Sequence, residues 1–216
     1  MGDRRDEPSG QRLDTDRIDL VASKPLVTKP IQIEKSSSSV GTMGMWLLLA
    51  SLGMLFGAAL VGYLVIRMRA PEWPPPGSTG LPAGVWISTV LLIILSILLV
   101  LVERGFRAGK NIEPARLLMA SVLVALAFLG SQIASWLRLV ANNENPQQSL
   151  LLWGFFTLTF LHAMHVLFGV VPLVITTLRA RMGRYTADRH EGVHLVAMYW
   201  HFLLVTWVVI LVVLHI

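Results

Sequence analysis

Four of the six histidines in the chain lie in the apolar runs of the stretch 152–207, at His162, His165, His194 and His201. Titratable rings at membrane depth are rare, and they usually face the protein interior. A neutral imidazole in such a place can bind haem iron or copper, pass a proton, or hydrogen-bond to a neighbouring helix. These three kinds of chemistry are the ones that the histidines allow.

The spacing of the histidines puts them in two pairs. His162 and His165 are three residues apart and share one face of a helix. His194 and His201 are two helical turns apart and share a face of the next helix. Two such pairs on consecutive membrane helices resemble the layout of a membrane di-haem cytochrome b. The spacing alone leaves haem or copper ligation open, favours hydrogen bonds between helices, and leaves a smaller place for proton transfer.

The composition is that of an integral membrane protein. Of the 216 residues, 54% are hydrophobic and 14% are charged, and the apolar residues come in blocks too long for the core helices of a soluble domain. The chain has no cysteine, which excludes disulfides, thiolate metal sites and iron–sulfur clusters from it. The net charge of +5 comes from segments that flank the apolar blocks, and nothing in it indicates nucleic-acid binding.

Five apolar blocks have the length of membrane-spanning helices, so the sequence predicts an all-α, polytopic membrane helix bundle. The predicted spans are residues 43–66, 85–102, 115–137, 150–178 and 192–216. The segment 1–42 is polar, with seven basic and seven acidic side chains, and we expect a disordered tail there. The predicted organisation is a tail over 1–42 followed by a five-helix domain over 43–216.

Lysine and arginine are distributed unevenly between the two sides of such a bundle. The tail and the two loops on its side carry 15 of the 18 Lys and Arg residues, and the opposite side carries 3. Because basic loops stay in the cytoplasm, we expect the N-terminus inside and the C-terminus outside. Arg116 and Arg179 then lie at the cytoplasmic ends of the third and fourth helices. There they could bind lipid phosphates, or they could only enforce topology.

Two motifs in the last two helices carry a family resemblance. The fourth predicted span reads FFTLTFLHAMHVLFG from Phe155 to Gly169, and the fifth contains YWHF at 199–202 followed by Trp207. Together they resemble subunit III of the haem–copper terminal oxidases of the cytochrome c oxidase type. The resemblance covers residues 43–216, and five helices rather than seven are similar to the short bacterial form.

The resemblance implies a non-catalytic role. A subunit of this family holds no haem and no copper, which belong to partner subunits. It packs mainly against oxidase subunit I, in one complex with subunit II, and it binds phospholipid and supports assembly and stability during aerobic electron transport. The implied location is the bacterial inner (plasma) membrane. The residues expected to contact neighbouring helices or lipid are His162, His165, Tyr199, Trp200, His201, Arg116 and Arg179.

Four positions depart from the family pattern. Where the family carries acidic residues within the membrane, this chain has Leu52, Ser135, His194 and Leu204. Leucine and serine cannot relay protons as a buried carboxyl can, so we expect no carboxylate proton relay inside the membrane. Such divergence also fits a subunit III-like accessory subunit of a nitric oxide reductase, and the di-haem cytochrome remains the alternative from another class.

Overall fold

The computed structural model describes residues 34–69, 84–110, 112–141, 150–185 and 191–215. Within these ranges the chain forms five α-helices and no strand. Their bounds are α2 Glu34–Met68, α3 Gly84–Arg107, α4 Ile112–Ala141, α5 Leu150–Arg181 and α6 Glu191–His215. All five are long and apolar enough to cross a membrane. The predicted all-α, five-span fold is confirmed.

The helices extend beyond most of the predicted span ends. The sequence prediction stopped each span at the first charged or polar residues, but a helix continues through such residues when their side chains reach the membrane surface. The largest difference is at α2, which begins at Glu34, so the positions 34–42 assigned to the tail are helical. The rest of the predicted tail, residues 1–33, lies outside the described residues, as does residue 216 at the end of the fifth span.

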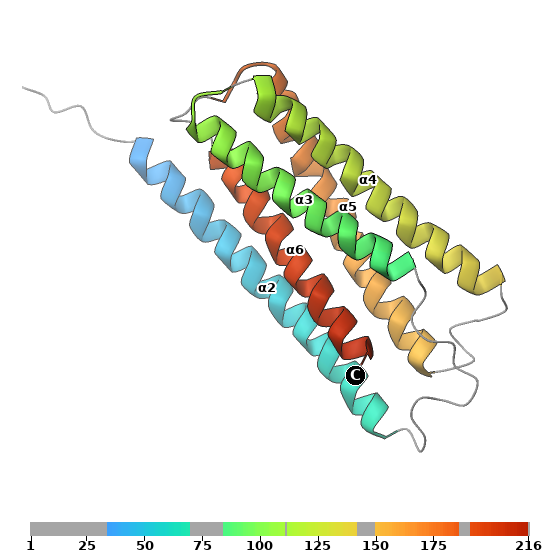
Figure 1. Cartoon of the computed structure of the whole chain (residues 1–216). Helices are drawn as coiled ribbons and strands as arrows, with labels where there is room; N and C mark the ends of the chain where they lie inside the picture. The colour runs from blue at the N-terminus through green and yellow to red at the C-terminus, as the bar shows by residue number, and fades with distance from the viewer. Residues whose placement is uncertain (1–33, 70–83, 111, 142–149, 186–190, 216) are drawn as a thin grey trace, which may run out of the picture. The chain divides into compact units, whose positions relative to one another are not determined.

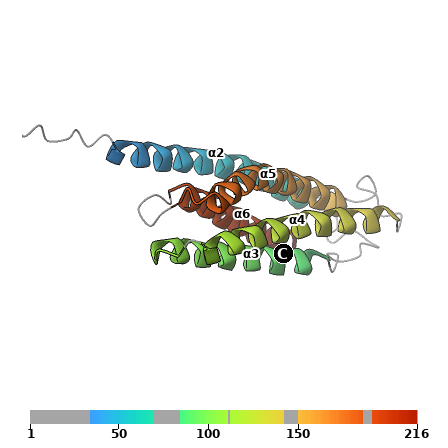
Figure 2. The same cartoon turned by 90° about the horizontal axis from the view of Figure 1, so that it is seen from above.

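Four of the helices form the packed centre of the domain. Their backbones approach each other closely in the pairs α3–α4, α4–α5, α5–α6 and α3–α6, which closes a four-membered ring. Chain neighbours run antiparallel, and so do α3 and α6 (Figure 1). The view from above shows α2 outside this ring, on the side of α5 and α6 (Figure 2). The last two helices are therefore the ones that contact the most neighbours.

Helix α2 contacts this ring of four helices through large side chains. Its backbone does not come as close to any of the other four described helices as their backbones come to one another. The ring of Phe56 lies 5.0 Å from the ring of His165 on α5, measured between centroids. Further along α2, the ring of Tyr63 packs directly on Gly154 of α5, where a β-carbon would overlap it. Glycine at that position is what lets the tyrosine seat against the α5 backbone.

Helices α3 and α5 end in the same way at the basic end of the bundle. Gly109 and Gly183 both have positive φ angles, 74° and 67°. Each closes its helix with paired backbone hydrogen bonds to the last turn, as in a Schellman motif. Arginines lie in both last turns, where cations favour the negative end of the helix dipole. These caps hold the basic side chains near the predicted membrane surface.

Candidate functional site

His162 lies in the middle of the bundle and is fully buried. Three aromatic rings from three other helices surround it: Trp207 at 5.0 Å, Phe128 at 5.9 Å and Phe56 at 6.1 Å between centroids. Within the described part of the chain, neither ring nitrogen has a hydrogen-bond partner. The imidazole is therefore held by packing between α2, α4, α5 and α6.

His165 and Tyr199 join α5 to α6. The Tyr199 hydroxyl donates a hydrogen bond of 2.8 Å to the backbone carbonyl of His165. The His165 ring turns back to its own helix, where Nδ1 donates to the carbonyl of Leu161 at 2.7 Å. The interhelical bond expected in this region thus uses the main chain of His165 rather than its imidazole. Both residues also line a groove of about 490 Å³ between α2 and the α5–α6 pair, whose other lining residues are apolar.

Trp200 packs on α5 close to the turn that contains His165. Its side chain is almost fully buried and lies against Gly169, beside the ring of Tyr199. Its indole Nε1 has no hydrogen-bond partner among the residues that the structure describes. Trp200 therefore contributes shape and apolar contact area to the α5–α6 interface.

Three hydrogen bonds connect α3 to α6 at regular intervals, and we call them the polar ladder. The α3 members are seven residues apart, about two helical turns, and the α6 members are seven and six residues apart. The rungs are Glu103–His194 at 2.9 Å, Ser96–His201 at 2.6 Å and Thr89–Trp207 at 3.0 Å. Since a shift of either helix by one residue would break all three, the ladder sets the register of the α3–α6 contact.

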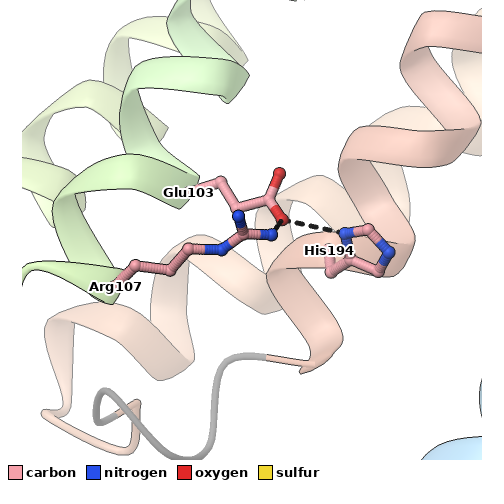
Figure 3. Close-up of polar contacts among 3 residues, drawn as sticks. All are labelled: Glu103, Arg107 and His194. Atoms are coloured by element: carbon pink, nitrogen blue, oxygen red, sulfur yellow. Dashed lines mark hydrogen bonds and ion pairs between the residues drawn. The ribbon is translucent and has the colours of Figure 1, made fainter.

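The rung at the basic end is an ionic cluster (Figure 3). One carboxylate oxygen of Glu103 accepts hydrogen bonds from Nδ1 of His194 and from the guanidinium of Arg107. The Glu103 side chain is only 15% exposed, against 43% for His194 and 61% for Arg107. A largely buried carboxylate is stabilised here by two donors from two helices.

The four membrane histidines do not converge on one site. His194 and His201 bond to side chains of α3, whereas His162 sits in its aromatic box and His165 bonds to its own helix. Over the described ranges there is no group of three or more His, Cys, Asp or Glu side chains that could hold a metal ion. The arrangement supports helix packing, and it lacks the facing histidine pairs that a di-haem site needs.

The two arginines singled out from the sequence differ in their surroundings. Arg116 lines a cavity of about 610 Å³ between α4 and α5 at the basic end, together with Arg181. Arg179 is exposed, and its carbonyl accepts the hydrogen bond that closes α5. It is not among the lining residues of that cavity.

The model of the family described as cytochrome c oxidase subunit III matches residues 39–216, which is most of the chain. The chain belongs to the cytochrome c oxidase subunit III family. The resemblance that the two motifs indicate is confirmed, and neither the di-haem cytochrome nor the nitric oxide reductase alternative is favoured. Membership in this family implies a place in a multi-subunit oxidase complex.

The relatives of this subunit III chain come from two kinds of oxidase. The chain is 26% identical over 175 residues to cytochrome c oxidase subunit 3 of Thermostichus vulcanus, and the match covers 81% of this chain and 86% of that one. It is 24% identical over 172 residues to cytochrome bo(3) ubiquinol oxidase subunit 3 of Pseudomonas aeruginosa, with 80% and 82% covered. It is 23% identical over 181 residues to quinol oxidase subunit 3 of Bacillus spizizenii, with 84% and 89% covered.

At the four positions where acidic residues were expected from the resemblance, three side chains of this subunit III chain make packing contacts or hydrogen bonds that are common within helices. Leu52 and Leu204 pack partly buried against the core. Ser135 donates to the carbonyl one turn earlier in α4. His194 is the exception, because the carboxylate of Glu103 lies against its ring. An acidic side chain is thus present beside position 194, but α3 supplies it.

The α3 residues of the polar ladder are not among the contacts predicted from the sequence, although hydrogen bonds between helices were expected for the α6 histidines. The signal was present in the sequence: Thr89, Ser96 and Glu103 are polar residues at seven-residue intervals, in a helix whose other polar side chains are Ser88 and the terminal Arg104 and Arg107. Polar side chains on one stripe of a membrane helix usually face a neighbouring helix.

Proposed function

We propose that this chain is the non-catalytic third subunit of a bacterial haem–copper terminal oxidase, acting in assembly and stability. Its main contact is subunit I, it shares the complex with subunit II, and haem and copper reside in those partners. The complex lies in the inner membrane, with the N-terminus of this chain in the cytoplasm. The observation that carries the proposal is the family match over residues 39–216. The relatives named for cytochrome c and for quinol oxidases extend the proposal to both classes of electron donor.

The geometry of the histidines supports a structural role. Every described hydrogen bond of His194, His201 and Tyr199 joins α6 to another helix of this chain. Lipid tails are as apolar as leucine, so helices in a bilayer gain no hydrophobic energy by associating, and polar contacts and close packing hold them together. We assign His162, His165, Tyr199, Trp200 and His201 to this packing. It gives the subunit a rigid surface for its partners.

Lipid contact is part of the same proposal. The groove between α2 and the α5–α6 pair is apolar apart from His165 and Tyr199, and it can take the acyl chain of a phospholipid. Arg116 and Arg179 are proposed to contact headgroups, because guanidinium groups bind phosphate oxygens in two-pronged fashion. Bound lipid would then fill surface between this subunit and its neighbours.

The experiment is a comparison of the oxidase with and without this chain. A purification tag on the chain is expected to recover a haem-containing membrane subunit and oxygen consumption with cytochrome c or quinol. The complex prepared from a strain lacking the chain is expected to keep its haem spectrum but to inactivate at a lower temperature. Recovery of the tagged chain with no haem-containing partner would contradict the proposal.

A further inference from the structure

A cavity of about 610 Å³ opens between α4 and α5 at the basic end of the bundle. This volume is within the range of roughly 300–1,000 Å³ that is usual for ligand pockets. Three alanines on its walls, Ala115 and Ala120 of α4 and Ala180 of α5, leave the space that larger side chains would fill. The cavity is a consequence of small residues facing each other across two helices.

Two unpaired arginines stand at this cavity. Arg116 comes from the second turn of α4 and Arg181 is the last residue of α5. No hydrogen bond or ion pair joins either guanidinium to another residue in the described ranges. The nearest acid on α4, Glu113, is bonded at 2.9 Å by Lys110. Two like charges beside one cavity repel, and an anion between them would relieve that repulsion.

The helix ends add to this preference for an anion. The start of α4 presents the positive end of its dipole at the same place. The carbonyl groups at the negative end of α5 accept the backbone hydrogen bonds around Gly183. The charge at the cavity is therefore positive overall.

The depth of the cavity selects an amphipathic anion. Below the arginines the lining is apolar and continues along α4 as far as Leu123, about two helical turns beyond Arg116. An inorganic phosphate would leave this apolar part unfilled, whereas a phospholipid has a phosphate at the right end and an acyl chain to follow the wall. Basic pockets between membrane helices on the side of the basic loops bind anionic headgroups.

We propose that this cavity is a binding site for one anionic phospholipid of the leaflet on the basic side, with its phosphate held by Arg116 and Arg181. The site is separate from the groove at His165 and Tyr199, and it deepens the lipid role in the proposed function, on which it rests. At this cavity the arginine from α5 is Arg181.

The test uses the purified oxidase complex in vesicles of equal parts phosphatidylglycerol and phosphatidylcholine. After extraction into detergent and washing, retained phosphatidylglycerol is counted per complex by mass spectrometry. The double variant Arg116→Gln/Arg181→Gln is expected to lower retention about a hundredfold, since a charge-assisted hydrogen bond is lost at each of the two arginines. The control Arg104→Gln/Arg184→Gln removes the same charge from the same end of the bundle at two arginines that do not line the cavity, and it is expected to retain the lipid.

A second variant, Ala120→Phe, fills the apolar part of the cavity without changing its charge, and it is also expected to lower retention. Equal loss in the two arginine double variants would overturn the site in favour of general surface attraction, and so would full retention in both Arg116→Gln/Arg181→Gln and Ala120→Phe. Recovery of haem with each variant is recorded in parallel. Unchanged lipid with haem still recovered contradicts the site alone, whereas a wild-type chain that recovers no haem contradicts the proposed function.

Discussion

The membrane histidines differ in what their side chains bond to, and each difference has an energetic consequence. His201 shares a hydrogen bond with Ser96 across two helices, whereas His162 is buried among aromatic rings with no partner in the described part of the chain. A buried polar group without a partner costs stability, and an apolar replacement of similar size removes that cost. Of the four histidines that the sequence offers as possible ligands, His162 is thus the one that packing alone holds in place.

We predict opposite effects for two substitutions of these residues. His162→Leu is expected to leave the thermal stability of the detergent-solubilised chain unchanged or raised. His201→Leu is expected to lower it by about 0.6–1.7 kcal/mol, the average and the maximum found for hydrogen bonds between membrane helices. Thermal unfolding of both variants in one detergent is the measurement. A large loss with His162→Leu and none with His201→Leu would show that the two roles have been reversed.

Glu103 offers a second prediction at this scale. Glu103→Leu removes the acceptor shared by Arg107 and His194, so we expect a loss of about 1 kcal/mol, again by the scale of interhelical bonds in membranes. Glu113 is the matched control, because its ion pair with Lys110 joins two exposed side chains. Glu113→Leu should not change the unfolding temperature measurably. If both leucine variants unfold alike, the α3–α6 rung does not hold the helices together.

At the scale of the helices, glycines determine how closely aromatic side chains approach α5. A β-carbon at position 154 would overlap the ring of Tyr63, whereas one at Gly130 on α4 would meet nothing within 4 Å. A tyrosine ring is rigid, so an added methyl group must displace the ring or the helix. The attachment of α2 to α5 therefore depends on one residue without a side chain.

This dependence predicts that Gly154→Ala destabilises the chain by about 1–3 kcal/mol, the usual cost of overpacking. Gly130→Ala is the control and should cost nothing, since alanine favours helix over glycine. Stability is measured by thermal unfolding, and the position of α2 by crosslinking between cysteines introduced on α2 and α5. Unchanged crosslinking and stability in the Gly154 variant would contradict the tight contact.

The sequence predicts the helices more completely than it predicts the contacts between them. The length and apolarity of the five blocks are enough to predict five spans. In a bilayer a continuous apolar segment of this length must form all its backbone hydrogen bonds within itself, and a helix does so. The start of α2 at Glu34 is not predictable in the same way, since charged residues can remain helical beyond the apolar block. The ladder partners of His194 and His201 depend on which helix lies beside α6, and no spacing within α6 contains that information.

At the scale of the whole molecule, the distribution of basic residues predicts the orientation. The side that carries 15 of the 18 Lys and Arg residues is expected to face the cytoplasm. Reporter fusions at Asn143 and at Gly183 test this, with activity of a periplasmic reporter expected only at Asn143. A periplasmic signal from the Gly183 fusion would reverse the topology and would move the proposed phospholipid to the other leaflet.

The central claim is that this chain serves a redox complex without holding a redox centre. The most direct measurement is the absorption spectrum and metal content of the full chain after purification apart from its partners, beside those of the complex from which it was removed. We expect no Soret band and no stoichiometric copper or iron in the chain, with haem remaining in the complex. A Soret band that follows the chain, and that disappears on substitution of His162 or His165, would contradict the structural role and would establish a haem-binding protein instead.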